Sequence, residues 1–171
     1  MAREGEKLNV SRVIREMAEY YEGQPERINH FMKVYGFAKT IGELEEIPPQ
    51  TLDILEAAAA VHDIGIKISE EKYNSCAGRY QELEGPPVAG ELLRRCGYRE
   101  ELIERICYLV GHHHTYSNMD GLDYQILVEA DFLVNLYEQK EDRQAILHAK
   151  ENIFRTKSGT ELLERLFPDV K

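Results

Sequence analysis

Apolar residues recur at a helical period along nearly the whole chain. No segment alternates apolar and polar residues as a half-buried strand would. The pattern therefore predicts an all-α fold, and 171 residues suit one compact helical bundle. The expected helices cover residues 11–21, 24–47, 51–63, 87–96, 99–111, 122–139, 143–152 and 158–167.

Local signals mark where several of these helices begin and end. Ser11 is expected to cap the first helix, and Ser158, followed three residues later by Glu161, the last one. Gly65 is expected to end the third helix. Residues 66–86 have charge, Gly and Pro but weak periodicity, so they predict an irregular segment with one short helix around "SEEKY". Such a loop beside a site is suited to contact a ligand.

Ionisable residues interrupt the apolar faces of three predicted helices. His30 begins the stripe of the second helix, His62 ends the stripe of the third with Asp63 beside it, and Asp131 lies in the middle of the buried face of helix 122–139. A buried, unpaired carboxylate costs several kcal/mol. A divalent cation between these side chains would neutralise the carboxylates and bind the neutral imidazoles. A hydrogen-bonded Asp–His network without metal is the alternative.

Composition narrows the possible partners. The chain is 43% hydrophobic and carries a formal net charge of −10. This acidity argues against a nucleic-acid polymer and against an anionic membrane surface, both of which select basic patches. A small phosphorylated ligand needs only a locally positive site, which a bound metal ion would supply.

Other features favour a cytoplasmic protein. No apolar run approaches the roughly 20 residues that span a bilayer, and the first ten residues, "MAREGEKLNV", lack the apolar core of a signal peptide. The three cysteines, Cys76, Cys96 and Cys107, are widely spaced and odd in number, as expected of reduced thiols. Cys107 lies in an apolar helical pattern and is interpreted as a core residue.

The ordered set of His30, the doublet His62–Asp63, and Asp131 resembles the HD domain superfamily of metal-dependent phosphohydrolases. The surrounding words "RINHFMKVYGFA", "AAAAVHDIG" and "LVEADFLV" are similar as well. The resemblance covers about residues 25–138 of a single domain, 1–171, with the helices over 143–167 packed on that core. It implies an all-α fold in which these four residues hold the metal.

The resemblance also implies candidates for a second metal. Some relatives use additional histidines, and in "LVGHHHTYS" His113 and His114 look similar to that pair, leaving His112 as the odd one out. Another histidine of those relatives is missing here, and Glu84 in "QELEGPPVAGELL" would replace it as an oxygen ligand. The alternative for the three histidines is an exposed connector.

Roles in catalysis follow from the same resemblance. Asp63 would bind the metal and orient or deprotonate a water molecule, and His113 would donate a proton to the leaving group. Lys67, one residue later than the family's usual lysine, would contact a substrate phosphate, unless it is an ordinary solvated lysine. Arg79 and His114 are further candidates for substrate binding, and 80–82 are weaker ones.

The implied activity is hydrolysis of a small phosphate ester or nucleotide-like compound by a metal-activated water. The His and carboxylate ligands suit one or two ions of Fe, Mn, Ni, Co or Zn better than Ca. Two other functions remain open: a dinuclear-iron oxygenase-like enzyme on the same scaffold, and a non-catalytic ligand-binding or regulatory module. A homo-oligomer is compatible with either.

Overall fold

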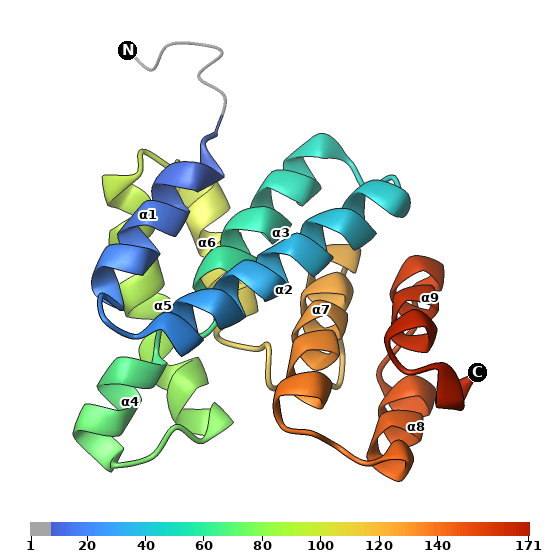
Figure 1. Ribbon diagram of the computed structural model, residues 1–171. Helices are drawn as coiled ribbons and strands as arrows, with labels where there is room; N and C mark the ends of the chain where they lie inside the picture. The colour runs from blue at the N-terminus through green and yellow to red at the C-terminus, as the bar shows by residue number, and fades with distance from the viewer. Residues whose placement is uncertain (1–7) are drawn as a thin grey trace.

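The computed structural model describes residues 8–171 as an assembly of helices, without a strand among them (Figure 1). This confirms the predicted all-α class and the single compact domain. Within this range, no helix is both long and apolar enough to cross a membrane. The first seven residues, part of the stretch inspected for a signal peptide, lie outside the described range. The helices are α1 Val10–Tyr20, α2 Pro25–Leu44, α3 Pro49–Val61, α4 Ile66–Tyr73, α5 Gly78–Arg95, α6 Glu100–Val110, α7 Leu122–Glu138, α8 Arg143–Asn152 and α9 Lys157–Leu166, followed by the short 3-10 turn Pro168–Val170.

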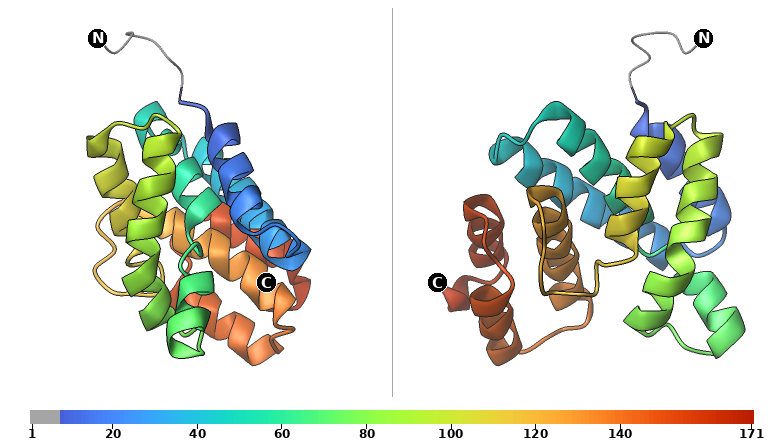
Figure 2. Two further views of the ribbon diagram at one scale, coloured as in Figure 1. Left: turned by 90° about the vertical axis from the view of Figure 1, so that its left-hand side faces the viewer. Right: turned by 180° about the vertical axis from the view of Figure 1, so that it is seen from behind.

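Helix α3 lies at the centre of the bundle and packs against α1, α2, α6 and α7 (Figures 1 and 2). Its second half is the alanine run Ala57–Ala60, in which every residue is fully buried. Side chains this small allow neighbouring helix backbones to approach closely. The close packing brings the C-terminal end of α3 into the interior, where α2 and α7 cross it.

The structure corrects the prediction for residues 66–86. The short helix expected around "SEEKY" is confirmed as part of α4, but most of the remaining residues form the first half of α5, which continues through Pro86 and Pro87. The prolines remove two backbone donors, which is why the sequence predicts a helix starting only at Pro87. Tertiary packing outweighs this cost, because Gly85 on α5 lies directly against Gly65. A Cβ on Gly65 would approach the Gly85 nitrogen to 2.7 Å.

Two predicted helix caps are also wrong by two residues. Asn9, not Ser11, caps α1, and its side chain accepts a hydrogen bond from the Ser11 backbone N–H. Thr156, not Ser158, caps α9 by accepting from the Gly159 N–H. Short polar residues cluster at both sites, and only the backbone conformation distinguishes which of them precedes the first turn.

The C-terminal helices α8 and α9 lie beside α7 at one end of the molecule (Figure 1). Hydrogen bonds to Glu129, a fully buried carboxylate of α7, hold the segment between α8 and α9 against α7. Glu129 accepts hydrogen bonds from the backbone N–H groups of Arg155 and Thr156, at 2.7 and 2.9 Å, and from the Thr156 hydroxyl at 2.6 Å. These donors satisfy the carboxylate that burial would otherwise penalise.

Candidate metal centre

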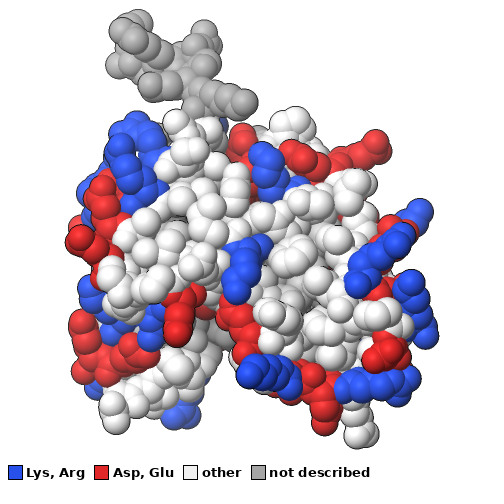
Figure 3. Space-filling view, viewed as in Figure 1, with Lys and Arg blue, Asp and Glu red and all other residues white. Residues whose placement is uncertain are grey.

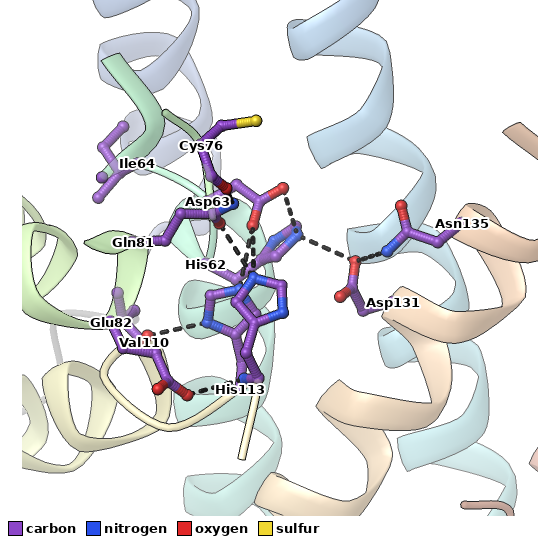
Figure 4. Close-up of polar contacts among 12 residues, drawn as sticks. His62, Asp63, Ile64, Cys76, Gln81, Glu82, Val110, His113, Asp131 and Asn135 are labelled. Atoms are coloured by element: carbon purple, nitrogen blue, oxygen red, sulfur yellow. Dashed lines mark hydrogen bonds and ion pairs between the residues drawn. The ribbon is translucent and has the colours of Figure 1, made fainter. Parts of the chain in front are cut away.

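Four of the predicted ligands meet in the interior: His30 from α2, His62 and Asp63 from the end of α3, and Asp131 from α7. One ligand atom from each lies within 4.8 Å of the others. The Nε2 atom of His30 is 3.2 Å from Asp63 and 3.4 Å from Asp131, and the Nε2 atom of His62 is 3.4 Å from each of the same carboxylates. Figure 4 shows the two carboxylates on either side of the histidines.

The turn that carries the doublet is held by its surroundings. The Tyr21 hydroxyl lies 3.2 Å from the carbonyl oxygens of both Asp63 and Ile64, and Tyr21 itself is fully buried. Gly65 follows in close contact with α5. The chain therefore leaves α3 in one defined direction, with both side chains of the doublet turned inward.

Hydrogen bonds at Nδ1 fix the orientation of three histidines. His62 and His113 each donate to a backbone carbonyl one turn earlier, those of Ala59 and Val110, at 2.8 Å. His30 donates instead to the Glu138 carboxylate at 3.1 Å. With the proton on Nδ1, the Nε2 atom of a neutral imidazole carries a lone pair directed at the cluster.

This donor set fits a divalent cation. The Nε2 atoms of His30 and His62 lie 3.1 Å apart, so two lone pairs would face each other unless a proton or a cation lies between them. Without a cation, burial would lower the pKa of His30, but hydrogen bonds to Asp131 and Asp63 outweigh it and raise that pKa to about 9. A site that attracts a proton this strongly also attracts a metal ion.

Asp63 belongs to a second group of possible ligands, with His113 and His114 from the loop after α6. One Asp63 oxygen faces the first cluster, while the other is 3.0 Å from His113 Nε2 and 4.0 Å from His114 Nε2. His112 lies outside this group and stacks on Tyr108 at 4.0 Å between ring centroids.

Helix α5 faces this second group with Gln81, not with Glu84. The Gln81 side chain is buried, and its oxygen lies 3.0 Å from His114 Nε2. Glu84 lies almost one turn further along and accepts hydrogen bonds from Lys72 and Tyr73, so it belongs to neither group. Glu84 is predicted from its short distance to the prolines. Because the sequence predicts no helix there, it gives no basis for choosing between Gln81 and Glu84.

Two predicted substrate contacts also lie elsewhere. Lys67 donates to the Tyr20 carbonyl at 3.3 Å, with its ammonium group 4.8 Å from the centre of the Tyr20 ring. Arg79 lies over the ring of Tyr80. Neither lines the cavity above the cluster. A lysine or arginine with an aromatic neighbour packs on it as readily as it binds a ligand.

A cavity of about 480 Å³ opens above the cluster and includes His30, Asp63 and His114 in its walls. Its arginine is Arg27, which lies one turn before His30 on α2 and pairs with Glu70 at 2.6 Å. This spacing was visible in the sequence, yet only the geometry makes Arg27 a site residue. Figure 3 shows the molecule hollowed between the part built by α4 and α5 and the part built by α7 and α8. The remaining lining residues are Glu26, Phe31, Ile66, Cys76, Gly78, Gln81, Asn135, Glu138 and Gln139.

A helical bundle that directs a His, a His–Asp doublet and a distant Asp at one point is the architecture of an HD-type metal site. The HD domain family model matches residues 27–154, and the chain belongs to that family. The fold is similar to the crystal structure of a predicted HD superfamily hydrolase from an uncultured Thermotogales bacterium. The TM-score is 0.67 at 21% identity, over 94% of this chain and 86% of that chain. No curated protein shows a significant match.

Proposed function

We propose that the protein is a metal-dependent phosphohydrolase acting on a small phosphate ester. The observation that carries this proposal is the convergence of imidazole lone pairs and two buried carboxylates at the floor of an open cavity. Membership of the HD family supports it, as does the similarity in fold to a protein described as a hydrolase.

His30, His62, Asp63 and Asp131 would hold the ion. A divalent ion there supplies activation of a water molecule and polarisation of a phosphoryl oxygen. The protein's own groups do the rest. Asp63 lies where it can orient that water and accept its proton, and Arg27 offers a positive charge to the phosphate at the cavity wall.

His113 and His114 face the other oxygen of Asp63, and the His113 ring lies edge-on to that of His62 with centroids 5.3 Å apart. Burial, aided by the neighbouring His113, lowers the pKa of His114 to about 4, so His114 is a neutral donor or ligand at physiological pH. Since the two Asp63 oxygens face different groups, the arrangement is compatible with a second ion beside His113 and His114. His113, the proton donor expected from the resemblance, is fully buried and does not line the cavity, whereas His114 does. In a site with one ion, a direct proton transfer from His113 to the leaving group is therefore not part of this proposal.

The test combines elemental analysis of protein purified without chelators with a screen of phosphate esters. The expected result is one or two transition-metal ions per chain and ester hydrolysis that Asp63→Asn abolishes. Lys67→Ala is the matched control, because its side chain packs on Tyr20 away from the cavity, and should retain activity. Two irons with substrate-dependent oxygen consumption would favour the oxygenase function. Metal-loaded protein that hydrolyses no ester and consumes no oxygen would favour a binding module.

A further inference from the structure

A second cavity of about 310 Å³ adjoins the one above the metal centre. Asn135 and Gln139, both C-terminal to Asp131, line both cavities. Asn135 donates a hydrogen bond to the Asp131 carboxylate at 2.9 Å, so the junction lies next to the candidate ligands (Figure 4). The two cavities therefore share wall residues beside the candidate ligands, close enough for one ligand to be proposed to contact both.

The walls of this second cavity are mostly apolar. Tyr116 and Phe132 form an edge-to-face pair with ring centroids 5.1 Å apart, and Phe132 directly follows Asp131 on α7. Helix α8 closes the opposite side with Ala145 and Ala149. Leu136 and Ile153 complete the apolar lining. Aromatic rings in this arrangement offer both face and edge to a third ring.

The distribution of charge separates the two cavities. The cavity above the metal centre has the cation Arg27 in its wall, paired with Glu70, and the carboxylates Glu26, Asp63 and Glu138. Such a wall can accommodate one phosphate beside a metal ion, whereas further phosphates would meet the carboxylates. Within residues 8–171, the second cavity has no lysine or arginine in its wall, and besides Tyr116 its ionisable side chains are Glu141 and His148.

We infer that the second cavity binds an apolar, ring-sized leaving group, and hence that the substrate is a phosphate monoester of an aromatic or similarly apolar alcohol, not a polyphosphate. This inference rests on the proposed function. A volume of about 310 Å³ is near the lower limit of ligand pockets and suits a group the size of a single ring. In the reaction, the water oxygen forms a bond to phosphorus, the P–O bond to the alcohol breaks, and a proton from the water passes to the alcohol oxygen.

The experiment compares phenyl phosphate, glycerol 3-phosphate and ATP as substrates of the metal-loaded enzyme. Phenyl phosphate is expected to have the highest kcat/KM. Tyr116→Ala and Phe132→Ala should each lower it about tenfold or more for phenyl phosphate, with little change for glycerol 3-phosphate. Tyr137→Ala is the matched control, because this tyrosine of α7 is 71% exposed and lines neither cavity. Phe132→Leu repeats the test if Phe132→Ala impairs folding.

Binding of phenylphosphonate, measured by calorimetry, separates this inference from the proposed function. If no ester is hydrolysed, the proposed function fails, yet weaker phenylphosphonate binding by Tyr116→Ala would still support the cavity as an apolar subsite. Equal binding by wild type, Tyr116→Ala and Phe132→Leu would overturn the inference. So would equal kcat/KM for all three substrates, or a preference for ATP.

Discussion

Glu138 on α7 accepts a hydrogen bond from Nδ1 of His30 on α2, at 3.1 Å. The corresponding bonds of His62 and His113 go to main-chain carbonyls of their own helices. Among these three histidines, His30 alone depends on the side chain of another helix for its orientation. The packing of α7 on α2 therefore contributes one ligand, Asp131, and orients a second.

Replacing Glu138 should weaken metal binding. Glu138→Ala removes the carboxylate that fixes the His30 ring, and losses of this kind cost about 10–100-fold in metal affinity. Glu138→Gln keeps an acceptor and should lose less. Because Glu138 also pairs with Lys33 at 2.7 Å, Lys33→Ala controls for that ion pair. Competition with a chromogenic chelator measures the affinities. Unchanged affinity in Glu138→Ala would refute the role.

Removing a ligand should separate metal binding from folding. His62→Ala is expected to lose the metal, because His62 is fully buried and its Nε2 faces both carboxylates. Asp63→Asn should abolish hydrolysis while circular dichroism remains that of the wild type. If His62→Ala bound no less metal and kept the wild-type stability, the first cluster would not be the metal site.

The metal-free protein should lose stability as pH rises from about 6.5 to 9. Hydrogen bonds to Asp131 and Asp63 raise the pKa of His30 to about 9 against the opposing effect of burial, and the pKa of His62 is raised as well. A histidine whose pKa is higher in the folded than in the unfolded protein stabilises the fold fully at pH values below its unfolded pKa, here about 6.5. This stabilisation is lost as the pH rises to the folded-state pKa. At ~1.4 kcal/mol per unit this amounts to about 3 kcal/mol for His30.

Thermal unfolding in the presence of a chelator, at several pH values, measures this loss. The metal-loaded protein should lack it, because the ion takes the place of the proton, and metal binding should release protons over the same range. A melting temperature of the metal-free protein that is constant from pH 6.5 to 9 would contradict the expectation.

Gly65→Ala should destabilise the protein by about 1–3 kcal/mol, as overpacking does. The new Cβ would lie 2.7 Å from the Gln81 carbonyl oxygen and from the Gly85 nitrogen, both backbone atoms that cannot yield without moving α5. Gly36→Ala is the control: a methyl group at this exposed position within α2 would meet no atom of another helix within 4 Å, and alanine there should stabilise by up to about 1 kcal/mol. Equal melting temperatures for the two variants would refute the close contact.

Glu129→Ala should cost about 3 kcal/mol, because it leaves the Arg155 and Thr156 N–H groups without their acceptor. Glu104→Ala, on the exposed face of α6, is the control and should change stability by less than about 0.5 kcal/mol. Urea unfolding measures both. If the effects were similar, the attachment of α8 and α9 would depend on apolar contacts instead.

The fold class could be predicted because apolar periodicity is a property of each helix by itself. The buried face of α7, including Tyr124, Leu127 and Asp131, lies where the sequence predicted it. Helix α5 was predicted only from Pro87 onward, since its first half is stabilised by contact with the Gly65 turn. No local pattern records a contact between residues 20 positions apart.

The same distinction explains the outcome for the site. His30, His62 and Asp131 could be predicted because each belongs to an apolar stripe, and Asp63 because it follows His62 in the doublet. Glu138 could not, because a polar residue on a polar face carries no such signal, and only the crossing of helices brings it to the cluster. Gln81 was a weaker candidate from the segment 80–82, and it does line the cavity. Lys67 was a reasonable expectation from the resemblance, but Tyr20 provides it with another partner.

The second cavity takes its apolar wall largely from residues after Asp131, with α8 held in place through Glu129. Asp131 is the last residue in the sequence that is proposed to act in bond cleavage. Most residues proposed to select the leaving group lie after it, from Phe132 onward. A change in α8 can therefore alter which ester is accepted without disturbing a metal ligand. Asn135 and Glu138 also follow Asp131 and contact candidate ligands, so an exchange confined to α8 is the direct route to redirecting the proposed activity.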